Sequence, residues 1–371
     1  MGSSMISFDF ISDDDFRLGL ESDYNEMLSA IEHSAYKSVH ILAGSIVEAI
    51  LIDTLIASGC VSKQNGLRMS LADAIAVARE KGIISETTAA LSSVVKEYRN
   101  LIHPGRAIRL QETPTAESAQ VAKALVAMVA RDVEGWKRRN YGYTAQQIVS
   151  KLGRDSSAVT IISHILAEAR PSEIERLLLV ILPNAYLRAS AAEATPDYVL
   201  SAYIQCYRTA FEQAPKALKK KVMGKFVKML KEESDSIILP YEIAFVRGSD
   251  LQYLPQSDAQ LVADHLVGRM QTGVTGPLLE ALEGIGTFLT ESSVNRFVDP
   301  LVKAVLHSSD SNLGRLARNR LVSEWYGMPL AIDNLTKARL DAWINLYRGR
   351  DQVEYVEILE EIKAELEEIP F

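Results

Sequence analysis

The feature that most constrains the fold is a helical periodicity that continues through almost the whole chain of 371 residues. Apolar residues recur every three or four positions, and short breakers rich in Gly, Pro, Ser and Asp separate the periodic segments. This spacing places apolar side chains on one face of a helix, whereas a strand would alternate apolar and polar residues. No strand-like alternation persists along the sequence. We therefore predict an all-α fold.

The first 140 residues predict a compact helical bundle. Residues 38–58 form its most apolar segment, and two carboxylates inside it, Glu48 and Asp53, favour a core helix over a membrane span. Residues 1–4 are interpreted as a cloning remnant, and the acidic run at 13–15 as a solvated arm before the first helix. The bundle is thus expected to cover residues 5–140, with other helices over residues 23–36, 70–81, 85–103 and 117–137.

Residues 141–371 show a different rhythm, in which amphipathic segments follow one another with short breaks. Several of these segments begin near a proline, which is favoured in the first turn of a helix. We expect a HEAT-like or TPR-like solenoid, or an irregular stack of helices. Residues 232–255 have the weakest helical pattern and are a candidate break between two halves of this domain.

Composition limits the kinds of function. The net charge is −8 and the pI is about 5.4, so no global positive field points to nucleic acid or to a membrane. Any anion-binding site must be local. Cys60 and Cys206 are far apart and lack metal-ligand spacing, which is typical of a reducing cytoplasm. The sequence predicts no metal ion, no cofactor and no membrane association.

The stretch Tyr98–Arg109, YRNLIHPGRAIR, carries the most specific chemistry. Arg99 and His103 are four residues apart, so their side chains share one helix face. Pro104 stops that helix just after His103, which leaves the imidazole near the negative end of the helix. A guanidinium and an imidazole held there suit a phosphate. The plainer alternative is a surface pair that satisfies the last carbonyl groups of the helix.

This layout resembles the HEPN domains of bacteria and archaea, which combine a helical bundle, a long apolar helix and an Arg-Asn…His motif near a helix end. The resemblance implies a metal-independent endoribonuclease, or an inactive relative, of a toxin–antitoxin or antiviral defence system. It also implies a homodimer in which both chains contribute to one cleft. Arg99 matches the arginine of the family motif, Asn100 the polar residue that often follows it, and His103 the histidine.

The resemblance assigns each of these residues a chemical role. His103 would act as a general acid or base, and Arg99 would stabilise the charge that develops on the phosphate. Asn100 would orient His103 or a phosphate oxygen. Glu48 is a candidate partner that fixes the side chain of Arg99. Arg106 and Arg109, just beyond the turn, are predicted to hold flanking phosphates.

A second basic feature lies within residues 216–231, where seven lysines surround an apolar stripe. A solvated helix face is the simpler interpretation of this pattern. The alternative is a surface for RNA phosphates or for an acidic partner, because local lysine clusters bind phosphates without sequence preference. The residues predicted to contact RNA in this helix are Lys220, Lys221, Lys225 and Lys228.

Two functions therefore remain. The first is a dimeric HEPN-type endoribonuclease whose C-terminal helices recognise RNA or a protein partner. The second is a non-catalytic dimeric scaffold that uses the bundle for dimerisation and the C-terminal array for docking. Three residues separate Arg99 from His103, where the family usually has four to six, and this spacing favours the scaffold. The arginines after His103 favour the enzyme.

Overall fold

The computed structural model describes residues 6–11, 13–92, 114–325 and 327–367. Every regular element in these ranges is a helix, which confirms the predicted all-α class. The chain divides into two compact units, Met1–Ile174 and Glu175–Phe371. The boundary predicted after residue 140 falls inside the first unit.

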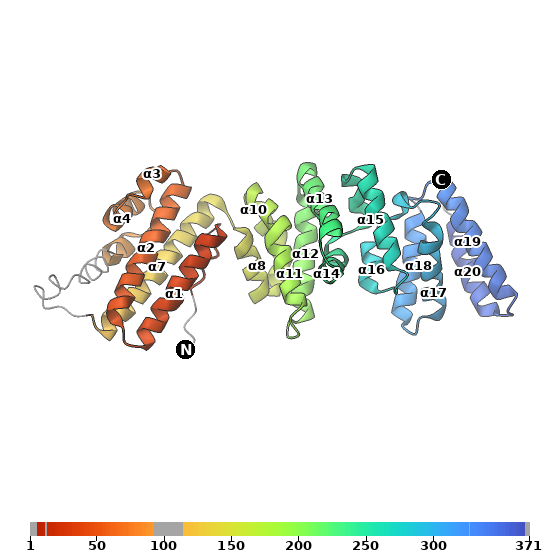
Figure 1. Cartoon of the computed structure of the whole chain (residues 1–371), viewed down its shortest axis with the longest axis horizontal. Helices are drawn as coiled ribbons and strands as arrows, with labels where there is room; N and C mark the ends of the chain where they lie inside the picture. The colour runs from red at the N-terminus through yellow and green to blue at the C-terminus, as the bar shows by residue number, and fades with distance from the viewer. Residues whose placement is uncertain (1–5, 12, 93–113, 326, 368–371) are drawn as a thin grey trace, which may run out of the picture. The chain divides into compact units, whose positions relative to one another are not determined.

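Unit 1 is built around the apolar helix α2, which packs against α1, α4 and α7 (Figure 1). A short helical stretch over residues 86–92 follows α4. The named helices of this unit are α1 (Asp14–Glu32), α2 (Tyr36–Ala57), α3 (Lys63–Gly66), α4 (Leu71–Glu80), α7 (Ala116–Tyr141), α8 (Ala145–Arg154), η1 (Ser156–Ile161), α9 (Ile162–Glu168) and the start of α10 (Pro171–Arg176).

Helix α2 is a core helix, as predicted. Ile46, Ile50 and Leu51 are fully buried, and each contributes roughly 1.5–3 kcal/mol through the apolar area it removes from water. The length and composition of α2 would allow it to cross a membrane, but 56% of its most apolar 18-residue window is buried inside the bundle. Its apolar character is therefore explained by packing against its neighbours.

The solvated arm predicted for the acidic run is wrong. The Asp13 side chain accepts a hydrogen bond from the Phe16 amide and caps α1, which begins nine residues before the predicted start. Asp14 and Asp15 lie in the first turn, where negative charge is favoured by the helix dipole. The carboxylates that look like a solvent-exposed run therefore start a helix.

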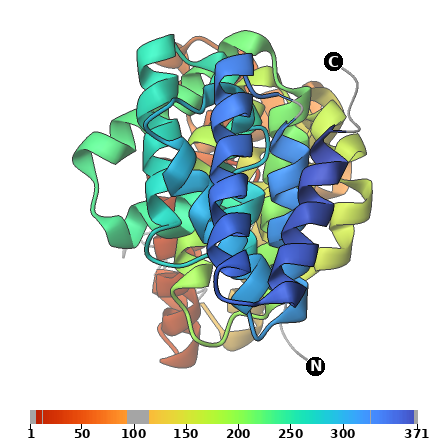
Figure 2. The same ribbon diagram turned by 90° about the vertical axis from the view of Figure 1, so that its right-hand side faces the viewer.

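Unit 2 consists of antiparallel helices that pack mainly on their neighbours in the chain. Helix α17 packs on α18 and α19, and α20 packs on α18 and α19 (Figure 2). The helices are η2 (Leu177–Ile181), α11 (Leu182–Ser190), α12 (Asp197–Gln213), α13 (Lys216–Glu232), α14 (Asp235–Phe245), η3 (Gly248–Tyr253), α15 (Gln256–Arg269), α16 (Gly276–Ala281), η4 (Gly286–Phe288), α17 (Val294–His307), α18 (Ser311–Trp325), α19 (Leu330–Arg348) and α20 (Val353–Glu367). Most of the candidate break at residues 232–255 is helical, in α14 and η3.

Ion pairs link successive helices of unit 2. An aspartate on one helix meets an arginine on the next helix of the series α14, α15, α17 and α19. The Asp299–Arg339 pair is bidentate, with both nitrogen–oxygen distances 2.6 Å. Because a guanidinium fork fits a carboxylate in few orientations, these pairs fix how the helices align. The pairs are Asp235–Arg269, Asp264–Arg296 and Asp299–Arg339.

Candidate functional site

The residues of the predicted HEPN-like motif lie outside the described part of the chain. These residues are Arg99, Asn100, His103, Arg106 and Arg109. Glu48, their predicted partner, is half-buried on α2. The pairing between Glu48 and Arg99 stays a prediction.

The predicted lysine surface on α13 is largely held by contacts within the protein. Lys221 pairs with Glu175, and the Lys228 ammonium lies 3.6 Å from a Glu232 carboxylate oxygen. Lys220 is exposed and makes no hydrogen bond or ion pair with any described residue. Three of the buried residues of α13, Val222, Phe226 and Met229, belong to the predicted apolar stripe.

Lys225 is the most constrained of the α13 lysines. Its ammonium donates a hydrogen bond to the Leu179 carbonyl, and its side chain is half-buried. Burial lowers the pKa of Lys225 below its ordinary value, and the negative charge of Glu233 opposes this shift only in part. A lysine that is desolvated and donates a hydrogen bond to a carbonyl is poorly placed to bind a phosphate.

A different cationic surface lies on α7 and α8 of unit 1, and the arginine groove is defined here as Arg131, Arg138, Arg139 and Lys151. Arg131 and Arg138 line two hollows, of about 380 Å³ and 640 Å³, which also share Glu134 in their linings. Within the described part of the chain, no hydrogen bond or ion pair engages any of the four side chains, and the three arginines are exposed. The groove therefore presents four cations without a hydrogen-bond or ion-pair partner among the described residues.

The carboxylates near the groove are already engaged elsewhere. Asp132 accepts a hydrogen bond from the Ser85 amide at 2.9 Å, and Glu134 accepts one from the Gln147 side chain at 2.9 Å. Together the described linings of the two hollows contain five cationic side chains and three carboxylates. Two of those carboxylates bind N–H groups of the protein, and none of the three forms an ion pair with a groove cation, so the guanidinium N–H groups remain available to an external anion.

The junction between α7 and α8 places Lys151 beside the arginines of α7. Helix α7 ends at Gly142, whose φ of +74° favours glycine, and a Cβ there would lie 1.5 Å from the Glu168 carbonyl oxygen. Thr144 then begins α8 with a capping box to Gln147, and its hydroxyl donates to the Asp9 carbonyl at 2.6 Å. These contacts fix the N-terminal segment as one wall of the smaller hollow.

Sequence reasoning missed the groove. The sequence places a domain boundary after residue 140, so Arg138 and Arg139 look like the end of the bundle and not like part of a site. A usable signal was present, since Arg131 and Arg138 are seven residues apart and therefore share one helix face. Nothing in the sequence, however, shows that the nearby carboxylates bind other groups.

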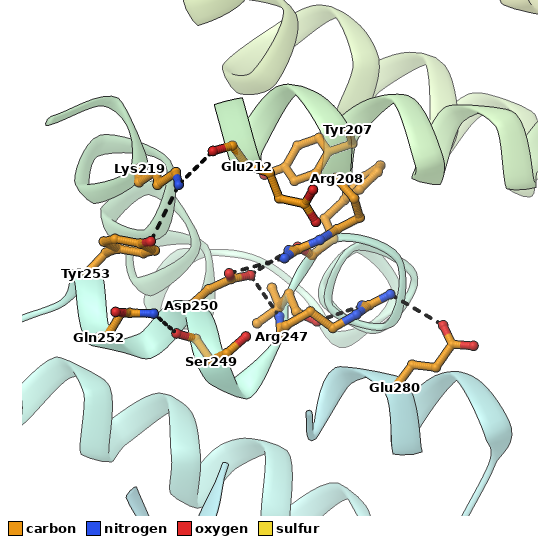
Figure 3. Close-up of polar contacts among 12 residues, drawn as sticks. Tyr207, Arg208, Glu212, Lys219, Arg247, Ser249, Asp250, Gln252, Tyr253 and Glu280 are labelled. Atoms are coloured by element: carbon orange, nitrogen blue, oxygen red, sulfur yellow. Dashed lines mark hydrogen bonds and ion pairs between the residues drawn. The ribbon is translucent and has the colours of Figure 1, made fainter. Parts of the chain in front are cut away.

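The polar network of Figure 3 has a structural role in unit 2. Arg208 on α12 makes two hydrogen bonds to Asp250, at 2.6 and 3.2 Å, and Asp250 also accepts from the Arg247 amide. Burial would lower the pKa of Arg208, but the hydrogen bonds and charge of Asp250 raise it above the ordinary value. The Arg247 guanidinium contacts Glu280 at 3.3 Å. The network joins α12, η3 and α16, and Arg208, Arg247, Asp250 and Glu280 each have a partner of opposite charge in it.

A second buried carboxylate, Glu242 on α14, also acts between helices. Its side chain is fully buried and lies 2.7 Å from the His265 ring and 2.8 Å from the Arg269 guanidinium, both on α15. A buried carboxylate needs such partners, because an isolated charge is costly away from water. Since Arg269 also pairs with Asp235, we interpret this cluster as a structural link between α14 and α15.

Comparisons of the chain with protein-family models, with curated proteins and with solved structures found no match. The likeness to HEPN domains therefore rests on the sequence features alone. The candidate binding site among the described residues is the arginine groove of unit 1.

Proposed function

We propose that the protein is an endoribonuclease of the HEPN type and that it cleaves RNA in unit 1. The observation that supports this proposal is the arginine groove of unit 1, whose four cations make no hydrogen bond or ion pair with a described residue. Phosphate binding is the chemistry that such arginines perform best. A homodimer, a protein partner for the C-terminal helices and a role in antiviral defence or as a toxin belong to the same proposal.

The proposed reaction needs only side chains of the protein and the ribose of the substrate. A base removes the 2′-hydroxyl proton, and the resulting oxygen attacks the adjacent phosphorus. The bond to the 5′-oxygen breaks, and that oxygen takes up a proton. The products are a 2′,3′-cyclic phosphate and a 5′-hydroxyl. His103 suits the proton transfer because its ordinary pKa lies near neutrality, and Arg99 suits the charge of the transition state.

The test is RNA cleavage in EDTA by the wild-type chain and by the single variants His103→Ala and Arg99→Ala. We expect the wild type to form 2′,3′-cyclic phosphate ends and each variant to lose at least about a hundredfold in rate, as is typical when an acid–base or charge-stabilising group is removed. Equal activity of all three proteins would refute the proposal and would indicate a contaminating nuclease.

The alternative is a non-catalytic dimeric scaffold. Two features favour it, namely the Asp–Arg pairs that align the helices of unit 2 and the engagement of the α13 lysines by the protein itself. A helical array in which most of the α13 lysines already have partners suits protein docking better than RNA binding. Absence of cleavage by the wild type, together with a dimeric mass in solution, would favour this alternative.

A further inference from the structure

The arginine groove has few groups left that could read a sugar or a base. Both ends of the Gln147 amide are used, because its oxygen accepts from the Thr144 amide and its nitrogen donates to Glu134. The Ser7 hydroxyl accepts from the Asp9 amide. The donors that remain are mainly cationic, and cationic groups bind phosphate without recognising the rest of the nucleotide.

The dimensions of the groove suit a single strand. Arg131 and Arg138 are seven residues apart, which is about 10 Å along a helix, so the two side chains can hold successive phosphates of one strand. The two hollows, of about 380 Å³ and 640 Å³, are comparable in size to small-molecule sites and too small for a base-paired helix. Tyr143 lies in the wall of the smaller hollow, and an aromatic ring beside cations is typical of single-strand binding.

We propose that the arginine groove is a binding site for the phosphates of a single nucleic-acid strand and that it does not distinguish RNA from DNA. Recognition of ribose is then left to the cleavage reaction, which needs the 2′-hydroxyl. This inference rests on the proposed function for one consequence only. A DNA strand in the groove binds without being cut, and it competes with the RNA substrate.

The test measures binding in a chain carrying His103→Ala, so that RNA stays intact. Fluorescein-labelled 20-nucleotide oligo-U RNA and oligo-dU DNA are titrated by fluorescence anisotropy at 0.1 M salt. We expect equal dissociation constants within about twofold, because phosphate contacts dominate. Adding Arg131→Gln, Arg138→Gln and Arg139→Gln should weaken both at least about tenfold.

A matched control removes three exposed arginines outside the groove, through Arg68→Gln, Arg188→Gln and Arg350→Gln. This variant has the same change in net charge and should bind within about twofold of the parent. A second control replaces the three groove arginines with lysine, which keeps the charge. It should retain most of the affinity, and its circular dichroism and that of the glutamine variant should match the parent.

The outcomes separate this inference from the proposed function. Equal affinities in the groove variant and in its matched control would overturn the groove as the binding site. An RNA affinity more than tenfold above the DNA affinity would refute the claim that the groove does not distinguish RNA from DNA. If the groove variant loses affinity for both RNA and DNA while the wild type cuts no RNA, the binding site is supported and the nuclease activity is refuted. If the wild type cuts RNA and unlabelled oligo-dU does not inhibit the cleavage, the nuclease activity is supported and the groove as the binding site is refuted.

Discussion

Helix α13 carries seven lysines and α7 carries five cationic residues. On each helix three cations contact no carboxylate or backbone carbonyl among the described residues, so α7 leaves the larger fraction of its cations available. Four of the α13 lysines, at positions 219, 221, 225 and 228, contact a carboxylate or a backbone carbonyl. On α7, Arg131, Arg138 and Arg139 contact neither among the described residues. The comparison teaches that the partners of a cation, more than the number of cations, decide whether a helix presents charge to a ligand.

The largest effect is expected from Gly142→Ala, which would disrupt the junction between α7 and α8 and with it the arginine groove. The new Cβ would overlap the Glu168 carbonyl oxygen, and the φ of +74° is unfavourable for alanine. Unit 1 should lose roughly 4 kcal/mol or more of folding free energy. The measurement is thermal unfolding followed by the fluorescence of Trp136, with Trp325 and Trp343 replaced by Phe.

Gly19→Ala is the control for that experiment. A Cβ at Gly19, inside α1, meets nothing within 4 Å, so alanine should stabilise the helix by up to about 1 kcal/mol. A Gly142→Ala protein as stable as the wild type would show that the junction between α7 and α8 adapts to a side chain.

The second prediction concerns salt. Nucleic-acid binding releases counter-ions, and each phosphate contact adds about 0.7 to the slope of log affinity against log salt for a single strand. Replacing Arg131, Arg138 and Arg139 with Gln should therefore lower that slope by about 2. Replacing Lys220, Lys221 and Lys228 with Gln should lower it by less than about 0.5. Equal losses in the two variants would remove the distinction between the helices.

The third prediction tests how firmly Lys225 is held. Its lowered pKa means that the unfolded chain binds this proton more tightly than the folded chain does. The stability of the wild type relative to Lys225→Met should therefore rise with pH between the folded pKa and the ordinary value of 10.5. Urea unfolding of both proteins from pH 8 to 10.5 measures this difference. A flat difference would show that burial does not disfavour the charged form.

The smallest effect should come from releasing α13 lysines. Glu175→Gln with Glu232→Gln removes the partners of Lys221 and Lys228. Exposed pairs are worth at most about 1 kcal/mol, so the affinity for oligo-U should rise by about threefold. A control with Glu354→Gln and Glu357→Gln, on α20, gives the same change in net charge. An equal gain in the control would mean that net charge alone is responsible.

The fold class followed from the sequence because burial and helical periodicity are properties of local spacing. The core helix α2 and the helix expected over residues 70–81, which is α4, were predicted on that basis. The start of α1 was missed, since a run of aspartates looks the same in a solvated arm and in a first turn. Side-chain pairing was beyond sequence reasoning, because Glu175 and Lys221 are distant in the chain. The arginine groove depends on such pairings, and the motif at Arg99 and His103 stays a prediction.

The Asp–Arg links of unit 2 bear on how this protein could change during evolution. Each link joins one helix only to the next in its series, so loss of a link disturbs a single joint and leaves the others aligned. A duplication or deletion of one helix pair would break one Asp–Arg pair, and the helix that becomes the new neighbour could supply the missing partner. Variation in length between descendants of this chain is therefore expected to accumulate in unit 2, while unit 1, with α2 enclosed by several helices, keeps its size.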